Sequence, residues 1–302
     1  MSEHNQDYKF IDRISSYEIS EQAKLKSNPM VSVLMITYNH ESYIAQAIEG
    51  VLMQKTDFAI EIVIGEDCST DRTREIVLDY QKKYPELIRV IISDNNVGMM
   101  NNSKRTMAAC RGKYMAICEG DDYWTDPYKL QKQVDFLEAN EDCTLCFHAT
   151  KFIYENNPER NFVHRPKKIP ANCKFTMKHA ILGGGGFMAT NSMLFHREYI
   201  LERPKWMDEA PVGDSPLMLL LASKGKMGFI DDVMSVYRVM TPNSWSSTMR
   251  DRQKSKKHHF AILKMWDDFD NWSNKKYHQF VVRKKLKNKL NYLIRSFRNI
   301  LK

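Results

Sequence analysis

The chain has 302 residues, 43% of them hydrophobic and 27% charged, so it can bury a large core as one big domain or as a domain with an appendage. Its formal net charge is +8, but residues 271–302 contain ten Lys or Arg and no acid, which leaves the first 270 residues at −2. That charge is not typical of a nucleic-acid binder, and because no run of about 18 apolar residues occurs, we expect no membrane-spanning helix.

The first 29 residues are polar and lack an apolar signal core, so the sequence predicts a loosely packed lead-in and no export signal. Six cysteines over this length are too sparse for a secreted disulfide scaffold, which predicts reduced thiols and a cytoplasmic protein. We therefore expect the core to begin at Val31.

Short apolar runs alternate with helical patterns between residues 31 and 118. The runs are rich in β-branched and large apolar residues, which favours strands, and the alternation predicts an α/β fold of the Rossmann-like kind: a mostly parallel mixed sheet with helices on both faces. Ser69 or Thr70 is the expected N-cap of the second helix, and Pro85 its stop. The predicted strands are residues 31–36, 60–64, 87–92 and 114–118, and the first and third helices are residues 42–54 and 99–110.

Pro127 opens a further helix, and the alternation weakens only after the strand predicted at 143–149, where residues 151–174 are irregular. Gly183–Gly186 is expected to be a flexible hinge, because its spacing matches neither a dinucleotide-binding fingerprint nor a Walker A loop. Cys143 and Cys146 have the spacing of a metal or redox pair, but no second pair occurs, and alternation in a buried strand explains them better. Further predicted elements are strands at 143–149 and 188–195, helices at 175–182 and 217–222, two short strands within 225–239, and helix from 254 to the end.

Polar residues follow three of the predicted strands: Thr37 the first, Asp67 the second, and Asp121 with Asp122 the fourth. The carboxyl ends of parallel strands meet at one edge of a sheet, where open α/β sheets bind ligands. Carboxylates there suit Mg²⁺ or Mn²⁺ held together with a substrate's phosphates. The sequence therefore predicts a metal-bound nucleotide at this edge, although aspartates are also common in turns for structural reasons alone.

Asp214 begins a predicted helix between Gly213 and Pro216. An aspartate at that position either caps the helix, which contributes about 1 kcal/mol, or acts as a general base that needs fixed geometry. Arg238 and Trp245 follow the last predicted strand. There, a cation and an indole either contact a diphosphate or a sugar or pack on the surface.

The last predicted helix, Phe280–Lys302, has apolar side chains broadly on one side and Lys and Arg on the other. A basic amphipathic helix is typical of an element that lies on an anionic membrane surface or docks a partner, here through residues 274–302. The alternative is a helix that packs on its own domain. The apolar residues are Phe280, Leu286, Leu290, Leu293, Ile294, Phe297 and Leu301.

Taken together, these motifs resemble family-two glycosyltransferases, an inverting group with the GT-A fold. The resemblance runs from Val31 to Trp245 and depends on five segments in the same order. It implies a lead-in at 1–29, a GT-A domain at 30–250 with a nucleotide-binding half (30–125) and an acceptor half (126–250), and basic C-terminal helices at 251–302. The segments are Val31–Asn39, Glu66–Asp71, Gly120–Asp122, Gly213–Asp214 and Tyr237–Arg238.

The resemblance also implies a role for each matching residue. Asp121 would contact the ribose, Asp122 would coordinate Mn²⁺ or Mg²⁺ on the diphosphate, and Asp214 would be the catalytic base. The residues implied in donor binding besides Asp121 are Thr37, Tyr38, Asn39, Asp67 and Arg238. The sequence departs from the family pattern at Glu66-Asp67-Cys68, where Asp-Asp-Gly or Asp-Asn is common, and at Met240, where a histidine often assists the metal.

The implied activity is transfer of one sugar from a nucleotide-sugar donor, expected to be a UDP-sugar, to a glycan or lipid-linked acceptor in surface polysaccharide synthesis. It would take place in the cytoplasm, where the enzyme is soluble or peripheral to the inner face of the membrane. One alternative is a sugar-nucleotide nucleotidyltransferase, which needs a Gly-rich phosphate loop straight after the first strand; Thr37–Glu41 contains none. A non-catalytic sugar-nucleotide binding module is another.

Overall fold

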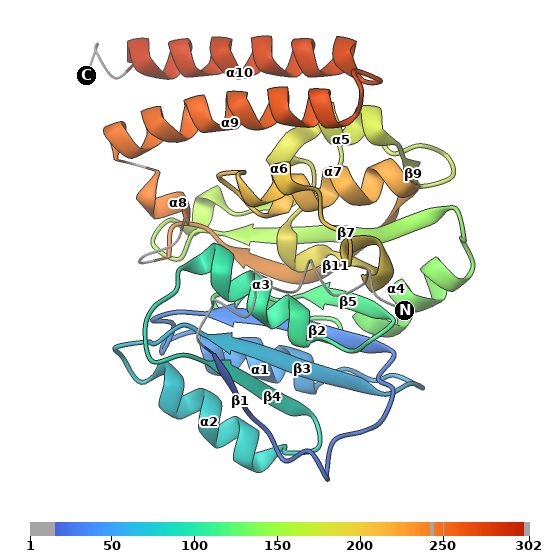
Figure 1. The fold of residues 1–302 in the computed structure, drawn as a ribbon, viewed down its shortest axis with the longest axis vertical. Coiled ribbons are helices and arrows are strands. Elements are labelled where there is room, and N and C mark those ends of the chain that lie inside the picture. Colours follow the sequence, from blue (N-terminus) through green and yellow to red (C-terminus); the bar gives the residue numbers. More distant parts are fainter. Residues whose placement is uncertain (1–15, 242–244, 250, 299–302) are drawn as a thin grey trace, which may run out of the picture.

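A computed structural model describes residues 16–241, 245–249 and 251–298, with the backbone alone described at 245–246 and 295–298. Within these residues eleven strands form one mixed sheet with helices on both faces (Figure 1). The strand order is β1-β4-β3-β2-β5-β10-β7-β11-β6, with β8 paired to β7 and β9 to β11. The predicted fold class is therefore confirmed.

The first half contains four parallel strands in the order β4-β3-β2-β5, as their apolar runs predict. Their residues are buried on both faces, because α1, α2 and α4 cover one face while α3, α5, α7 and α9 cover the other. The elements are β2 (Val31–Thr37), α1 (Ile44–Leu52), β3 (Ile60–Glu66), α2 (Thr73–Lys83), β4 (Ile88–Ile92), α3 (Met99–Ala109), β5 (Tyr114–Ile117) and α4 (Lys129–Glu138).

The predicted N-cap of α2 is wrong. The helix begins at Thr73, whose backbone N–H donates to the side chain of Asp71 at 2.9 Å. Ser69 and Thr70 instead join two loops: Ser69 Oγ accepts from the backbone N–H of Asn39, and Thr70 N donates to Asn39 Oδ1. A side chain that suits a cap is used for a contact between loops that are about 30 residues apart in the sequence.

The second half adds antiparallel and parallel strands. β10 (Leu194–His196) lies antiparallel between β5 and β7 (Cys143–Ile153), so the sheet becomes mixed at this point. Two short strands were expected within 225–239, but β11 (Lys226–Arg238) is one strand parallel to β7, with register shifts around Ile230 and Val233. The remaining elements are β6 (Tyr123–Trp124), β8 (Phe162–His164), β9 (Lys174–Phe175), α5 (Met177–Gly183), α6 (Lys205–Asp208), α7 (Asp214–Lys224) and α8 (Trp245–Thr248).

Two features of this half bear on earlier expectations. Cys143 and Cys146 are buried in β7, where burial raises the pKa of the Cys143 thiol to about 11, as expected of structural cysteines. The glycine run, expected to be a flexible hinge, forms a 3₁₀ turn at Gly184–Gly186. Gly184 has φ +61°, and a Cβ there would lie 2.4 Å from Nζ of Lys284, so glycine is needed for the approach of the C-terminal helices.

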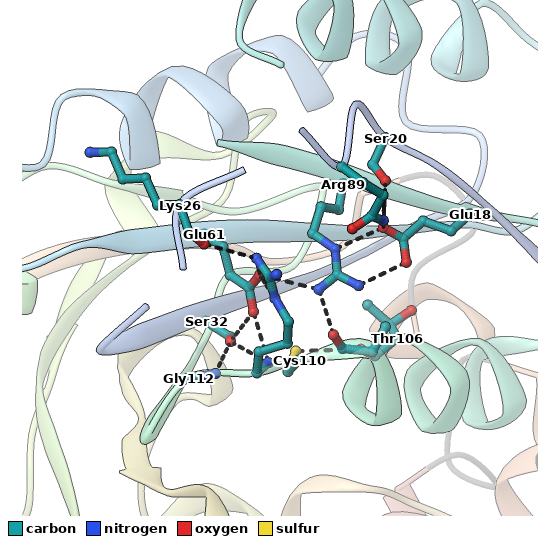
Figure 2. A network of polar contacts seen from close by, with 12 residues as sticks. Glu18, Ser20, Lys26, Ser32, Glu61, Arg89, Thr106, Cys110 and Gly112 are labelled. Carbon is teal, nitrogen blue, oxygen red and sulfur yellow. Dashed lines mark hydrogen bonds and ion pairs between the residues drawn. The ribbon is translucent and has the colours of Figure 1, made fainter. Parts of the chain in front are cut away.

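A buried ion network lies at the amino ends of the parallel strands, opposite the predicted site (Figure 2). Arg89 of β4 pairs with Glu61 of β3 at 3.1 Å and with Glu18 at 2.7 Å, and Glu61 also accepts from Ser32 of β2 at 2.6 Å. Glu18 belongs to β1 (Tyr17–Ile19), which pairs antiparallel with β4. The expected loose lead-in therefore adds an edge strand to the sheet.

The chain ends in two long helices, α9 (Arg252–Trp272) and α10 (His278–Arg298), which lie along each other at one end of the molecule (Figure 1). α9 buries Trp266 and Phe269 against the main core, and α10 contacts α9 and α5. In the described part of the chain, no helix combines the length and apolar character needed to cross a membrane.

Candidate functional site

The acidic turn after β5 is held against β2 by backbone hydrogen bonds. Cys118 N donates to Leu34 O, and Gly120 N donates to Ile36 O, both at 3.0 Å. A Cβ on Gly120 would lie 2.8 Å from Thr37 Oγ1 and 2.9 Å from His40 Nδ1. Glycine is therefore required for the close approach of this turn to the β2 loop, and the turn's carboxylates are fixed at the carboxyl edge of the sheet.

Asp122 is built into the protein interior. Its side chain is 1% exposed; Oδ1 accepts the backbone N–H of Arg238 at 2.9 Å, and Oδ2 accepts Nδ2 of Asn191 at 2.8 Å. Burial and the charges of Asp121 and Glu119 raise the pKa of Asp122 well above its usual value. The carboxylate thus joins the acidic turn to β11 and to the loop before β10.

Asp121 is partly exposed at the same turn. Its Oδ2 accepts from Thr241 Oγ1 at 2.9 Å, and its backbone oxygen accepts from Arg238 at 2.6 Å. His40 lies close enough for Asp121 and Asp71 to raise its pKa, but burial is the larger effect and lowers it overall. Asp121 is therefore the more accessible of the two adjacent aspartates.

Arg238 is the last residue of β11 and is 6% exposed. Besides Asp121 it contacts Glu155 at 2.9 Å, and its guanidinium lies over the rings of Tyr43 and Tyr123, 4.9 and 4.6 Å from their centroids. These contacts lock the arginine beside the acidic turn. The side chain of Trp245 lies outside the described residues.

The loops after β2 and β3 meet as expected from their order in the sheet. Asp67 N donates to Thr37 O at 3.1 Å, and the Asp67 carboxylate accepts the N–H groups of Val97 and Gly98, both at 2.9 Å. Thr37 and Asp67 are buried, whereas Tyr38 is 36% exposed beside them. Asn39, at φ +54°, is the residue whose side chain and backbone bind the β3 loop.

A cavity of about 710 Å³ opens beside the acidic turn, and both Asp214 and Glu119 line it. Asp214 is the first residue of α7; its Oδ1 accepts the N–H of Ser215 at 2.6 Å, and burial raises its pKa. A Cβ on Gly185 would lie 3.3 Å from Asp214 Oδ2, so the glycine turn leaves room at this carboxylate. The cavity extends from there to α9 and α10, which contribute His258 and Asn288.

Glu119 is a site residue that sequence reasoning missed. Its Oε2 is buried without a hydrogen-bond partner, and burial, followed by the charges of Asp121 and Asp214, raises its pKa to about 8. The only sequence signal was its place next to Gly120-Asp121. Its proximity to Asp214, 95 residues later, comes from the folded chain.

The structure therefore brings all the predicted site residues whose side chains are described to one edge of the sheet or to the adjoining cavity wall. Among the described residues, no group of three or more His, Cys, Asp or Glu is arranged to hold a metal ion by itself. A metal at this edge would therefore need ligands beyond the protein, such as phosphates and water, as is usual for Mg²⁺ bound with nucleotides.

Curated relatives share much of this chain. Uncharacterised proteins of Mycobacterium tuberculosis and Mycobacterium bovis are 36% identical over 228 residues, which are 74% of this chain and 63% of theirs. An uncharacterised glycosyltransferase of Methanocaldococcus jannaschii is 27% identical over 82% of this chain and 81% of its own length. The chain thus spans less than two thirds of the mycobacterial relatives' length.

Solved structures share the fold at low identity. Residues 1–349 of TarS from Staphylococcus aureus, in complex with UDP-GlcNAc, have a TM-score of 0.58 at 16% identity, and the match covers 80% of this chain and 66% of that fragment. A mannosyltransferase of Pyrobaculum calidifontis, in complex with GDP-Man and Mn²⁺, has a TM-score of 0.55 at 16% identity, over 80% of this chain and 64% of its own. The sequence model of the glycosyl transferase family 2 matches residues 32–203, more than half of the chain. The chain therefore belongs to glycosyl transferase family 2, and its fold is GT-A.

Proposed function

We propose that this chain is a metal-dependent inverting glycosyltransferase that moves one sugar from a nucleotide-sugar donor to an acceptor hydroxyl. The observation that carries the proposal is the placement of Asp214 on the wall of a large cavity that also reaches the acidic turn. A base and a donor-binding edge on the same cavity are what direct sugar transfer requires. Membership of the glycosyltransferase family supports the same reaction class.

The donor's nucleotide would lie across the loops after β2 and β3. Tyr38 offers an exposed ring for stacking on the base, and Thr37 and Asn39 shape the loop that carries it. Asp67 would accept from the base with the lone pairs that the backbone N–H groups of Val97 and Gly98 leave available. Arg238, fixed beside Asp121, is proposed to contact the diphosphate side of the donor.

Oxygen ligands for Mg²⁺ or Mn²⁺ are available at the acidic turn. The buried, unpartnered Oε2 of Glu119 and the partly exposed carboxylate of Asp121 have the chemistry that such a cation prefers. The family resemblance implies Asp122 for this role, but Asp122 is 1% exposed and both of its oxygens accept protein hydrogen bonds, so we propose the partly exposed Asp121 as the metal ligand. When bound, the ion would neutralise negative charge that develops on the diphosphate leaving group.

Asp214 would remove the proton of the acceptor hydroxyl. The hydroxyl oxygen forms a bond to the anomeric carbon while the bond from that carbon to the diphosphate oxygen breaks, and the electron pair leaves with the diphosphate. Attack from the face opposite the leaving group inverts the configuration. Because burial raises the pKa of Asp214, its carboxylate is a stronger base than an exposed aspartate.

The donor is proposed to be a UDP-sugar, and the acceptor a glycan or lipid-linked saccharide of a surface polysaccharide. Support comes from TarS, which binds UDP-GlcNAc, and from a Bacillus subtilis relative, 31% identical over 51% of this chain, whose name assigns it provisionally to teichuronic acid biosynthesis. Because the mannosyltransferase of similar fold binds GDP-Man, the donor screen described below also includes GDP-sugars. We place the reaction in the cytoplasm.

Donor binding and slow donor hydrolysis test the proposal. UDP- and GDP-sugars are screened by thermal shift with and without Mn²⁺, since a bound donor raises the unfolding temperature. With the donor that binds, Asp214→Asn should keep Mn²⁺-dependent binding and lose hydrolysis at least 100-fold, while Asp121→Asn should lose the Mn²⁺-dependent part of binding. Asp57→Asn, at an exposed loop before β3, is the matched control and should behave as wild type. Unchanged hydrolysis in both site variants would contradict the mechanism.

A further inference from the structure

Helix α10 has two faces with different environments. Val281 and Lys284 are buried, and Asn288 lines the cavity; these three positions fall within an arc of about 60° on a helix with 3.6 residues per turn. Lys284 fixes this face in place, because its Nζ donates to the backbone oxygens of Leu182 and Gly183, at 3.3 and 2.9 Å, at the end of α5. This inner face packs on the protein's own domain.

The opposite face of α10 is exposed and apolar. Its apolar residues occupy an arc of about 120° centred roughly opposite the inner face. Packing of α10 on its own domain therefore does not explain why these exposed residues are apolar. The exposed fractions are 39% for Val282, 61% for Leu286, 58% for Leu290, 51% for Leu293 and 42% for Ile294.

Basic side chains flank this apolar row. Lys289 lies on one side of it and Lys287 on the other, while Arg283 lies within the arc near its end; all three are exposed. On the neighbouring helix α9, Phe260 is 56% exposed, and its ring lies 6.4 Å from that of Tyr292 of α10. An exposed apolar patch of this kind marks an interaction surface.

The charge of the helix decides which partner fits. Residues 271–302 carry ten Lys or Arg and no acid, so two copies of α10 packed face to face would bring like charges together with no carboxylate between them. Figure 1 shows α10 as a straight helix, the outermost at one end of the molecule, so the exposed apolar residues that it carries follow a straight line rather than forming a cup for a protruding segment. A straight apolar row flanked by cations matches a flat anionic lipid surface, into which the leucines insert while the cations meet the headgroups.

We propose that α10 lies on an anionic bilayer through the row Val282–Ile294 while its inner face closes the cavity that holds Asp214. His258 and Ile262 of α9 line the same cavity, so the bound surface and the acceptor cavity share their two helices. In this orientation only the width of α10, about 10 Å, separates the cavity from the bilayer, which favours a saccharide carried on a membrane lipid as the acceptor. The acceptor assignment rests on the proposed function; the docking does not.

Vesicle co-sedimentation of the full chain tests the docking. Wild type at 0.1 M NaCl should bind phosphatidylcholine vesicles that contain 30% phosphatidylglycerol at least tenfold more tightly than vesicles of phosphatidylcholine alone. Leu286→Glu with Leu290→Glu should weaken binding to the anionic vesicles at least tenfold. The matched control is Leu201→Glu with Val233→Glu, two exposed apolar residues elsewhere, and it should bind as wild type.

A second pair separates charge from apolar contact. Lys287→Glu with Lys289→Glu should weaken binding at least tenfold, whereas Lys24→Glu with Lys82→Glu, at exposed sites away from α10, should change it less than threefold. Circular dichroism must give the same unfolding temperature for all four variants, and donor hydrolysis without vesicles should be unchanged in the Leu286 and Leu290 variant.

Two results would overturn the docking. One is wild type that binds anionic vesicles no more tightly than vesicles of phosphatidylcholine alone, and the other is a concentration-dependent dimer that the leucine variant abolishes. Vesicle binding that persists in a chain without donor hydrolysis leaves the docking intact and refutes the proposed function alone.

Discussion

Asp122→Asn distinguishes a metal ligand from a residue that holds the acidic turn. The asparagine oxygen can still accept the backbone N–H of Arg238, but its Nδ2 then faces Nδ2 of Asn191, donor against donor. Asn191 cannot turn its amide around without loss, because its Oδ1 accepts from Ser235 and its Nδ2 also donates to Val236 O.

The expected loss of stability follows from this geometry. Leaving buried donors without an acceptor costs about 1–3 kcal/mol. Removing one charge also relieves repulsion with Asp121 and Glu119, so we expect the free energy of unfolding to fall by about 1–2 kcal/mol. The corresponding drop in unfolding temperature is about 2–6 °C.

Urea unfolding and donor titration with Mn²⁺ provide the assay. Asp122→Asn should be less stable yet keep donor affinity with Mn²⁺ within tenfold of wild type, whereas Asp121→Asn should keep its stability and lose the Mn²⁺-dependent affinity. If Asp122→Asn retains full stability and loses the Mn²⁺ effect, then Asp122 binds the metal directly, and the structural reasoning is refuted.

Three further predictions concern stability and the turn. Lys129 is fully buried, and burial lowers its pKa to about 7, so between pH 7 and 10.5 its side chain binds a proton in the unfolded chain but not in the folded protein. The free energy of unfolding of wild type should therefore rise with pH in this range, by up to ~1.4 kcal/mol per pH unit. Lys129→Met should remove that rise in urea titrations at pH 6.5, 8 and 9.5. Gly120→Ala should weaken donor binding at least tenfold in calorimetry, and Gly186→Ala, where a Cβ meets nothing within 4 Å, should not; equal effects would contradict the packing argument. Arg89→Met removes the ion-pair partner of Glu18 and one of the two arginines that pair with Glu61, leaving Arg111 at 2.8 Å, and should cost about 1–3 kcal/mol in denaturant unfolding, while Arg72→Met, at an exposed pair, should leave the midpoint unchanged.

Much of the nucleotide-binding half could be predicted from local sequence. Strands β2, β3 and β5 are apolar runs of the length that a buried parallel strand needs, and polar residues follow each run at once. Because parallel strands end at the same edge, the alternation alone placed Thr37, Asp67 and Asp121 together. Predictions were wrong where a residue type suits two structural roles. Ser69 and Thr70 could cap a helix, but they bind the neighbouring loop through Asn39 instead of capping α2.

Other features depended on contacts between distant segments. The local sequence of residues 225–239 predicts two short strands, but pairing with β7 carries one bulged strand through Asp231 and Asp232. Nothing near Glu119 in the sequence shows that its oxygen is buried beside Asp214. Burial and electrostatic interaction at such a position depend on which segments pack there, and a sequence pattern does not contain that information.

The sequence by itself determined the order of strands and helices in the first half of the sheet, the polar edge of the sheet and the basic amphipathic character of the last helix, because each follows from periodicity within one segment. Only the tertiary structure decided that Asp122 is buried while Asp121 is partly exposed, and that α10 turns its leucines outward and Val281 and Lys284 inward. The physical reason is the same in both cases. Periodicity shows that a helix or turn has two sides, but the packing of other segments decides which side water reaches.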